Sequence, residues 1–275
     1  MIAALRYEWV RLTTIRSTYW LLGATLVLYL ALTLTVGFSI DDSEVGSLVD
    51  GRQTLAAMLT VGASAGIAPL LLAYIIGIIG VFSMGHEYRH GMIRATLTAV
   101  PNRFAVLAAK LVSIAVVAIV GSVLTMLVGI FSVLVVGLDL PIASGFTAEL
   151  VLGVVLYAIL FSWVGVALAG LIRHQTAAVA LLILLPTVIE SILRALLRLR
   201  QLLSDHPDRP DAIANLANFL PFDAGGKMYT RASVADLISI GGAEPFGPVG
   251  GGIVMAVFVA LLLAGMTYLF VRRDA

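Results

Sequence analysis

The chain has 275 residues, of which 60% are hydrophobic and only 12% are charged, and its formal net charge is +1. Soluble domains are closer to half apolar and a quarter charged, so this composition indicates a chain that folds in lipid. The balanced charge gives no reason to expect a nucleic acid as a partner. The absence of cysteine excludes disulfides and thiolate metal sites. The sequence therefore predicts one membrane domain over residues 1–275 and not a soluble enzyme.

The first 16 residues have the pattern of an amphipathic helix at the inner membrane surface. Apolar side chains recur there at helical spacing, namely Ile2, Leu5, Trp9, Leu12 and Ile15. The charged residues of this segment occupy other positions, namely Arg6, Glu8, Arg11 and Arg16. We expect this helix to lie along the interface before the chain turns into the membrane.

A helix needs roughly 20 apolar residues to cross the hydrocarbon core of a bilayer. Six stretches meet this requirement, at about 18–40, 63–84, 105–137, 150–172, 176–193 and 249–271. The sequence therefore predicts an all-α integral membrane protein with six spans, the fifth of which carries a possible kink at Pro186. Residues of about 194–248 are predicted to form an outer loop, with an interfacial helix at 194–203 and irregular structure after it.

The basic residues indicate the orientation of these spans, because Lys and Arg accumulate in cytoplasmic segments. With the N-terminus inside, the inner segments carry ten Lys and Arg residues and the two short outer loops carry only Arg52. The last outer loop carries six, but loops of this length cross the membrane largely regardless of charge. Both termini are therefore predicted to be cytoplasmic.

The second predicted span is followed by His86-Glu87-Tyr88-Arg89-His90, which matches the H-E-x-x-H pattern of zinc proteases. On a helix this spacing puts both imidazoles on one face for zinc, with Glu87 as the general base. A third ligand at a motif-like spacing is missing, and Arg89 places a cation between the two histidines. The alternative interpretation is that these charged and aromatic residues mark the exit of the span from the bilayer.

Glu190 is an acidic residue inside an apolar run, near the outer end of the fifth predicted span. Ionisable groups inside membranes are costly and are candidates for function. Arg194 lies one helical turn further on, so a partly solvated ion pair between the two is the alternative to a role in transport. The sequence leaves both interpretations of Glu190 open.

The segment around the end of the second span resembles a known signature. Residues 87–103, which read EYRHGMIRATLTAVPNR, and the later Lys110 are similar to the cytoplasmic connection after the second span in permease subunits of type-2 ABC exporters, particularly actinobacterial ones. The charged start that leads into Arg-Ser-Thr at 16–18, the LPFDAG stretch at 220–225 and the basic tail at 272–275 also resemble that family. The resemblance thus runs the length of the chain.

This resemblance implies a multi-pass permease of a bacterial plasma membrane that pairs with a second, identical or related, permease chain. Each permease would dock on a cytoplasmic ATPase that binds ATP and magnesium, and this chain would hold no cofactor or metal of its own. The coupling helix between spans two and three would contact the ATPase through Glu87, Tyr88, Gly91, Met92, Ile93, Arg94, Leu97, Pro101 and Arg103. The N-terminal interfacial helix, with Glu8, Trp9, Arg11 and Arg16, would assist this docking.

Two other functions stay open at this point. One is an intramembrane zinc protease that uses His86, Glu87 and His90, and the other is a membrane scaffold, sensor or immunity subunit. For the permease, the apolar walls of the spans are compatible with drugs, peptides or lipids as substrate.

Overall fold

The computed structural model describes residues 2–14, 16–41, 51–65, 70–93, 96, 98, 102–202, 214–230 and 246–272. Within these ranges the chain forms helices and short connections and contains no strand. Six of the helices are long and apolar enough to cross a membrane. The prediction of an all-helical protein with six potential membrane spans is therefore confirmed.

Five of these candidate spans are single helices, namely α2 (Arg16–Asp41), α4 (Leu71–Arg89), α6 (Arg103–Val136), α7 (Gly145–Ile172) and α12 (Pro248–Arg272). The other one comprises α8 (Gln175–Leu184), a π-helical turn (Leu185–Ile189) and the start of α9 (Glu190–Leu202). The shorter helices are α1 (Ile2–Thr14), α3 (Gly51–Thr60) and α10 (Pro221–Gly226), with 3-10 turns at Ala63–Ala65 and Ala214–Phe219.

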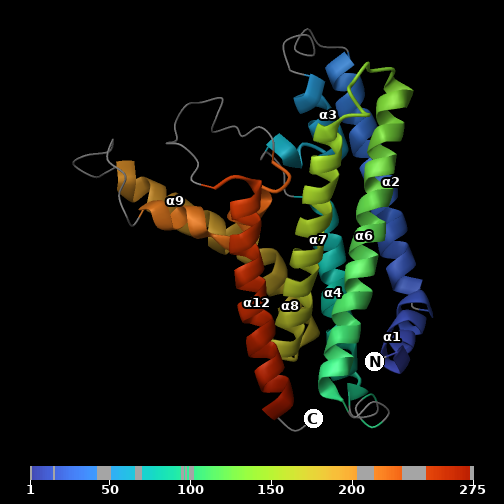
Figure 1. Ribbon diagram of the computed structural model, residues 1–275, viewed down its shortest axis with the longest axis vertical. Helices are drawn as coiled ribbons and strands as arrows, with labels where there is room; N and C mark the ends of the chain where they lie inside the picture. Colours follow the sequence, from blue (N-terminus) through green and yellow to red (C-terminus); the bar gives the residue numbers. More distant parts are fainter. Residues whose placement is uncertain are drawn as a thin grey trace.

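The long helices run side by side in one bundle (Figure 1). Helix α1 and the last turn of α12 lie at the same end of this bundle, which we call the proximal end. Helix α3 and the connection from α6 to α7 lie at the opposite, distal end. Helices α4 and α7 are the most buried of the candidate spans, so they form the centre around which the other helices pack.

Glycines bring the backbones of α4 and α7 into direct contact. A Cβ atom on Gly165 would lie 2.3 Å from the carbonyl oxygen of Gly77, and one on Gly80 would lie 2.5 Å from that of Ser162. Contacts this close exclude any larger residue unless the helices separate. Small residues at helix interfaces are a common way of packing helices in membranes, where lipid competes for apolar surface.

The second span differs from its predicted range of 63–84. Helix α3 ends at Thr60, and Val61 and Gly62 then adopt positive φ angles of 53° and 78°, which an α-helix cannot contain. Helix α4 begins only at Leu71 and continues through Arg89. Most of the H-E-x-x-H segment therefore belongs to the last turn of this helix.

The fifth span is not the single helix predicted at 176–193. Pro186 lies in the π-helical turn between α8 and α9, as expected for a residue that cannot donate a backbone hydrogen bond. After this turn α9 leaves the bundle and runs crosswise to α12 at the distal end of α12 (Figure 1). The interfacial helix predicted to start at Arg194 thus starts four residues earlier, at Glu190.

Residues 214–230 fall within the predicted outer loop, but the part from 222 to 229 packs against the bundle. The ring of Phe222 lies 5.6 Å from that of Phe161 on α7 and 5.7 Å from that of Phe258 on α12. A Cβ atom on Gly153 of α7 would lie 1.9 Å from the carbonyl oxygen of Met228. This part of the chain is therefore a re-entrant segment in contact with two membrane helices.

The close contact at Gly153 predicts a loss of stability when a methyl group is added there. Because the obstructing atom belongs to the backbone, Gly153→Ala must displace the re-entrant segment, and we expect a cost of about 1–3 kcal/mol. The matched control is Gly23→Ala in α2, where the added Cβ atom would meet nothing within 4 Å. Thermal unfolding in detergent, followed by tryptophan fluorescence, should show a lower midpoint for Gly153→Ala alone. Equal midpoints for the two variants would contradict the packing of this segment.

Candidate functional site

Four charged side chains from three helices meet at the proximal end of the bundle. Glu8 and Arg11 come from α1, Glu87 from the last turn of α4, and Lys110 from the second turn of α6. We call these four residues the proximal ion cluster. The side chain of Lys110 is fully buried, and those of Glu8 and Glu87 are 2% exposed. Charges this deeply buried are stable only when they are paired.

Lys110 is the centre of the cluster. Its ammonium group donates to Oε1 of Glu8 at 2.6 Å, to Oε1 of Glu87 at 2.5 Å and to the backbone carbonyl of Ser83 at 3.1 Å. A lysine ammonium has three protons to donate, and all three have an acceptor here. One side chain thus joins α6 to both α1 and α4.

Arg11 adds a second cation from the side of α1. Its guanidinium nitrogens lie 2.6 Å from Oε1 of Glu87, 2.8 Å from Oε2 of Glu8 and 2.7 Å from the carbonyl oxygen of Ser83. With two acids and two bases, the cluster is formally neutral. Each carboxylate contacts both cations, so the removal of any one member leaves an unbalanced charge in a buried place.

Helical spacing explains how the sequence builds this cluster. Glu8 and Arg11 are three residues apart on α1, and Ser83 and Glu87 are four apart on α4, so each pair shares a face. Helix α6 begins at Arg103 after the Asn102 side chain accepts a hydrogen bond from the amide of Ala105 at 3.1 Å. This cap fixes the start of α6, and Lys110 follows in the second turn of the helix.

The residues predicted to form a coupling helix divide into exposed and buried ones. Gly91, with a φ of 66°, and Met92, with 49% of its surface exposed, lie on the surface after α4 ends. Ile93 is buried. Glu87, which was expected to offer a polar contact to an ATPase, is buried in the ion cluster and not exposed at the surface. Three further predicted residues lie outside the described ones, namely Arg94, Leu97 and Pro101.

Two other predicted coupling residues contact neighbouring helices of the chain itself. The guanidinium of Arg173, at the proximal end of α7, lies 5.4 Å from the centre of the Tyr88 ring. Arg103 donates hydrogen bonds of 2.9 Å to the carbonyl oxygens of Phe270 and Val271. Cations are favourable at the C-terminus of a helix, so Arg103 holds the last turn of α12 against the start of α6.

The N-terminal helix was predicted correctly as a helix, but its charged face is oriented differently from the expectation. The buried positions of α1 include Glu8, which points into the bundle, whereas Trp9 is 51% exposed. Arg11 is also turned inward, and Arg16 is exposed at the start of α2. The predicted apolar side of α1 is therefore divided, because Leu12 is buried in the bundle whereas Trp9 lies on the surface, where lipid would contact it.

The histidines of the H-E-x-x-H segment lie on the same side of α4, as their spacing predicts. The rings of His86 and His90 are 6.0 Å apart and nearly parallel. Glu87 points elsewhere, toward Arg11 and Lys110. Among the described residues, no group of three or more histidine, aspartate or glutamate side chains is placed to hold a metal ion. The carboxylate that would act as general base is thus already held by two cations.

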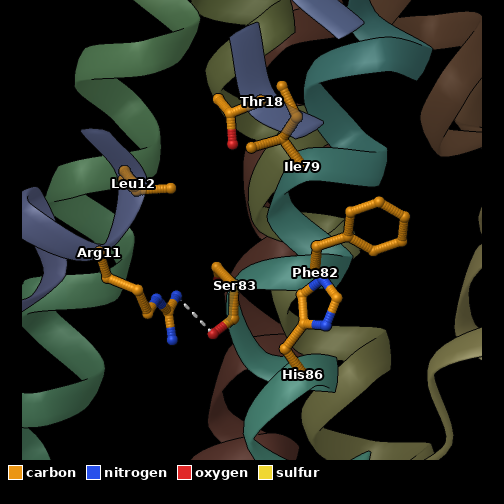
Figure 2. Close-up of a pocket in the computed structure, with 7 residues that line it drawn as sticks. All are labelled: Arg11, Leu12, Thr18, Ile79, Phe82, Ser83 and His86. Carbon is orange, nitrogen blue, oxygen red and sulfur yellow. Dashed lines mark hydrogen bonds between the residues drawn. The ribbon is translucent and has the colours of Figure 1, made fainter. Parts of the chain in front are cut away.

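A shallow crevice lies beside the ion cluster, between α1, the start of α2 and α4 (Figure 2). It is lined by Arg11, Leu12, Thr18, Ile79, Phe82, Ser83 and His86. The dashed line in Figure 2 marks the hydrogen bond from Arg11 to the carbonyl of Ser83. The crevice therefore leads from the outside of the bundle to the guanidinium that joins α1 to α4.

Glu190 forms a second polar site at the distal end, and its partners differ from the prediction. Its two carboxylate oxygens accept hydrogen bonds from the backbone amides of Phe222, at 3.2 Å, and Asp223, at 2.9 Å. Arg194 does not form the expected ion pair with Glu190 but pairs with Asp223 at 2.8 Å. Glu190 is 4% exposed and not partly solvated. It therefore caps α10, the short helix of the re-entrant segment.

Comparison with known proteins adds no family to this description. Neither the protein-family models nor the curated proteins contain a match to the chain.

The burial of Lys110 predicts a large loss of stability when its charge is removed. In Lys110→Met the carboxylates of Glu8 and Glu87 keep only Arg11 as a partner, and breaking a buried pair costs about 3–5 kcal/mol. The matched control is Arg6→Met, which removes an exposed cation from α1 and should change stability by less than about 0.5 kcal/mol. Unfolding in mixed micelles measures both values.

A double-mutant cycle separates loss of charge pairing from loss of packing. If the cluster is held by charge, Glu8→Gln should be less destabilising in the Lys110→Met background than in the unchanged chain. Additive losses would show that Lys110 contributes through its packing alone.

Proposed function

We propose that this chain is the membrane-spanning permease subunit of an ATP-driven exporter, with its proximal end in the cytoplasm. The observation that carries the proposal is the proximal ion cluster, which joins the two helices that flank residues 90–102 to each other and to α1. The excess of Lys and Arg in the segments at this end supports the cytoplasmic orientation. The resemblance of residues 87–103 to exporter permeases supports the identity of the partner.

In this proposal the cytoplasmic partner is an ABC ATPase, and its docking surface is the connection between α4 and α6. Gly91 and Met92 are the exposed members of the predicted coupling residues that the structure describes. Gly91 has no atom within 4 Å of the position of a Cβ, so another protein surface can approach its backbone closely. Met92 offers an apolar side chain beside it, and methionine is common at adaptable interfaces.

The ion cluster has a mechanical role in this proposal. When ATP binding draws two ATPase subunits together, the docked connection moves, and both of its flanking helices must follow. Because Lys110 bonds to Glu87 and Glu8, α4, α6 and α1 would move as one unit. Rigid-body motion of a helix unit is a common form of alternating access. The chain would supply the pathway, and the ATPase would carry out the hydrolysis.

A second candidate function, an intramembrane zinc protease, follows from the H-E-x-x-H pattern. The nearly parallel rings of His86 and His90 favour it, since they share one face. The ion pairs of Glu87 with Arg11 and Lys110 oppose it, because they hold the carboxylate that would serve as general base. The permease explains the position of Glu87, and the protease does not.

Purification of the tagged chain from its native membranes in mild detergent tests the two functions together. The permease predicts a stoichiometric ATPase in the eluate, and His90→Ala should leave both its yield and its ATP hydrolysis within about twofold, since surface substitutions cost little. The protease predicts a chain with about one bound zinc, which His90→Ala would remove. A zinc-bearing chain without an ATPase would overturn our proposal.

Two glycines of the same conformation at opposite ends of the bundle allow a controlled test of the docking surface. Gly91 and Gly137 have φ angles of 66° and 84°, and neither has an atom within 4 Å of a built Cβ. We expect Gly91→Trp to reduce co-purification of the ATPase at least tenfold, and Gly137→Trp to leave it unchanged. Both variants carry similar backbone strain, so only the docking surface distinguishes them.

Met92→Glu provides an independent probe of the same surface without backbone strain. A charge placed in a largely apolar contact should weaken ATPase binding by about tenfold, roughly 1.4 kcal/mol. The thermal midpoint of the isolated chain should not change, because Met92 is half exposed. Unchanged ATPase binding in both Met92→Glu and Gly91→Trp would move the docking surface elsewhere.

A further inference from the structure

Helix α9 has a position that the bundle itself does not explain. It follows the π-helical turn at Leu185–Ile189 and extends sideways from the bundle, crosswise to α12 (Figure 1). The 25 residues of α12 give it a length of about 38 Å, slightly more than the roughly 30 Å of a hydrocarbon core. The distal end of α12 therefore lies near the membrane boundary. The first residue of α9 bonds to α10, and α10 packs against Gly251 in the first turn of α12, so the start of α9 lies at the same depth.

One face of α9 is apolar and exposed. Its members are Ile192, Leu193, Leu196 and Leu199, of which 55%, 44%, 58% and 50% of the surface is exposed. Residues 192, 196 and 199 follow one another at intervals of four and three, so they share one side of the helix. Glu190 and Arg194 occupy the opposite side, where they bond to α10. The apolar side is thus turned away from the re-entrant segment.

The chain continues the same exposed apolar surface from the bundle onto α9. In the stretch just before it, Leu184, Val188 and Ile189 are 45%, 42% and 47% exposed. These residues belong to a candidate membrane span, where such a surface contacts lipid. The apolar side of α9 is therefore an extension of the lipid-facing surface along the plane of the membrane.

The charges of α9 point to the kind of lipid. The helix carries three arginines, at 194, 198 and 200, and its single acid, Glu190, is buried against α10. Arg194 is on the side that faces α10, whereas Arg200, four residues after Leu196, shares the apolar side. Basic residues within or beside an apolar helix face are typical of interfacial helices that bind anionic membranes. Long arginine side chains extend from such a helix toward the headgroups.

We propose that α9 is a membrane-surface helix, which inserts its apolar side into the distal leaflet and binds anionic phospholipid headgroups through Arg198 and Arg200. The proposal needs only that the bundle spans a membrane, and it is independent of the transport function proposed above. It has a consequence for the interior, because the first turn of α9 also holds α10 through Glu190 and Arg194. Lipids at the distal surface would thereby stabilise the position of the re-entrant segment.

The absence of cysteine from the chain makes a site-specific test direct. Leu196→Cys places a fluorophore on the apolar side of α9, and Ser191→Cys places one on an exposed position of a different side. Each labelled full-length protein is placed in nanodiscs of phosphatidylcholine, with or without phosphatidylglycerol. The measurements are quenching by nitroxide-labelled acyl chains and quenching by aqueous iodide.

We expect the probe at 196 to be quenched severalfold more by the acyl-chain nitroxide than the probe at 191, and iodide to give the opposite order. Equal access of iodide to both probes would overturn the proposal. Disulfide-linked dimers of Leu196→Cys at high yield would also overturn it, because they would show that a second copy of the chain covers this face.

The arginines are tested in the same system. We expect phosphatidylglycerol to increase lipid quenching at 196, and Arg198→Gln combined with Arg200→Gln to abolish that increase. The matched control combines Arg6→Gln with Arg16→Gln, which removes two exposed cations at the proximal end and should leave the increase intact. Quenching that does not depend on phosphatidylglycerol, or that falls equally in both double variants, would overturn the assignment of anionic lipid.

Discussion

The structure depends on one buried ammonium group. Lys110 is fully buried near the start of a membrane helix, where an unpaired charge would cost several kcal/mol. Its acceptors come from Glu8 on α1 and from Ser83 and Glu87 on α4. None of these three helices can move far relative to the others without leaving a buried charge unpaired. The docking of α1, which is too short to bury much apolar surface, follows from this electrostatic requirement.

At the distal end another buried charge, that of Glu190, also needs partners. Here the partners are backbone amides and not side-chain cations. A short helix inside the bundle begins with free amides, which have no water to bond to there. Glu190 supplies both oxygens to the amides of Phe222 and Asp223. An acid that looks isolated in an apolar run is therefore the cap of a helix more than thirty residues later. At each end, long-range polar contacts add to the packing that holds a short element in place.

The sequence predicted those features that composition and local spacing determine, and it missed those that depend on distant partners. The number of potential spans follows from the lengths of the apolar runs, and the helix at the N-terminus follows from its periodicity. An ion pair of Glu190 with Arg194 was one of two interpretations that the local spacing allowed, but Arg194 pairs with Asp223, 29 residues further on. Glu87 was interpreted as a surface residue because the sequence does not reveal that Lys110 and Arg11 converge on it. The start of α4 was missed because hydropathy continues across the break at Gly62.

Around the end of α4 some residues are buried and others are exposed, and this difference limits which of them can contact a partner protein. Glu87 could bind a partner protein only if it lost its ion pairs with Arg11 and Lys110. It is therefore better suited to link α4 to α1 and α6 than to contact a partner. In the proposed docking, the contact with the ATPase would fall on exposed residues, and Met92 beside Gly91 meets that condition. The buried Glu87 and the exposed Met92 are only five residues apart. A movement of the surface at Met92 would therefore be passed directly to the ion cluster. Under this arrangement, substitutions in the cluster should affect folding and coupling together, whereas those at Met92 should affect binding alone.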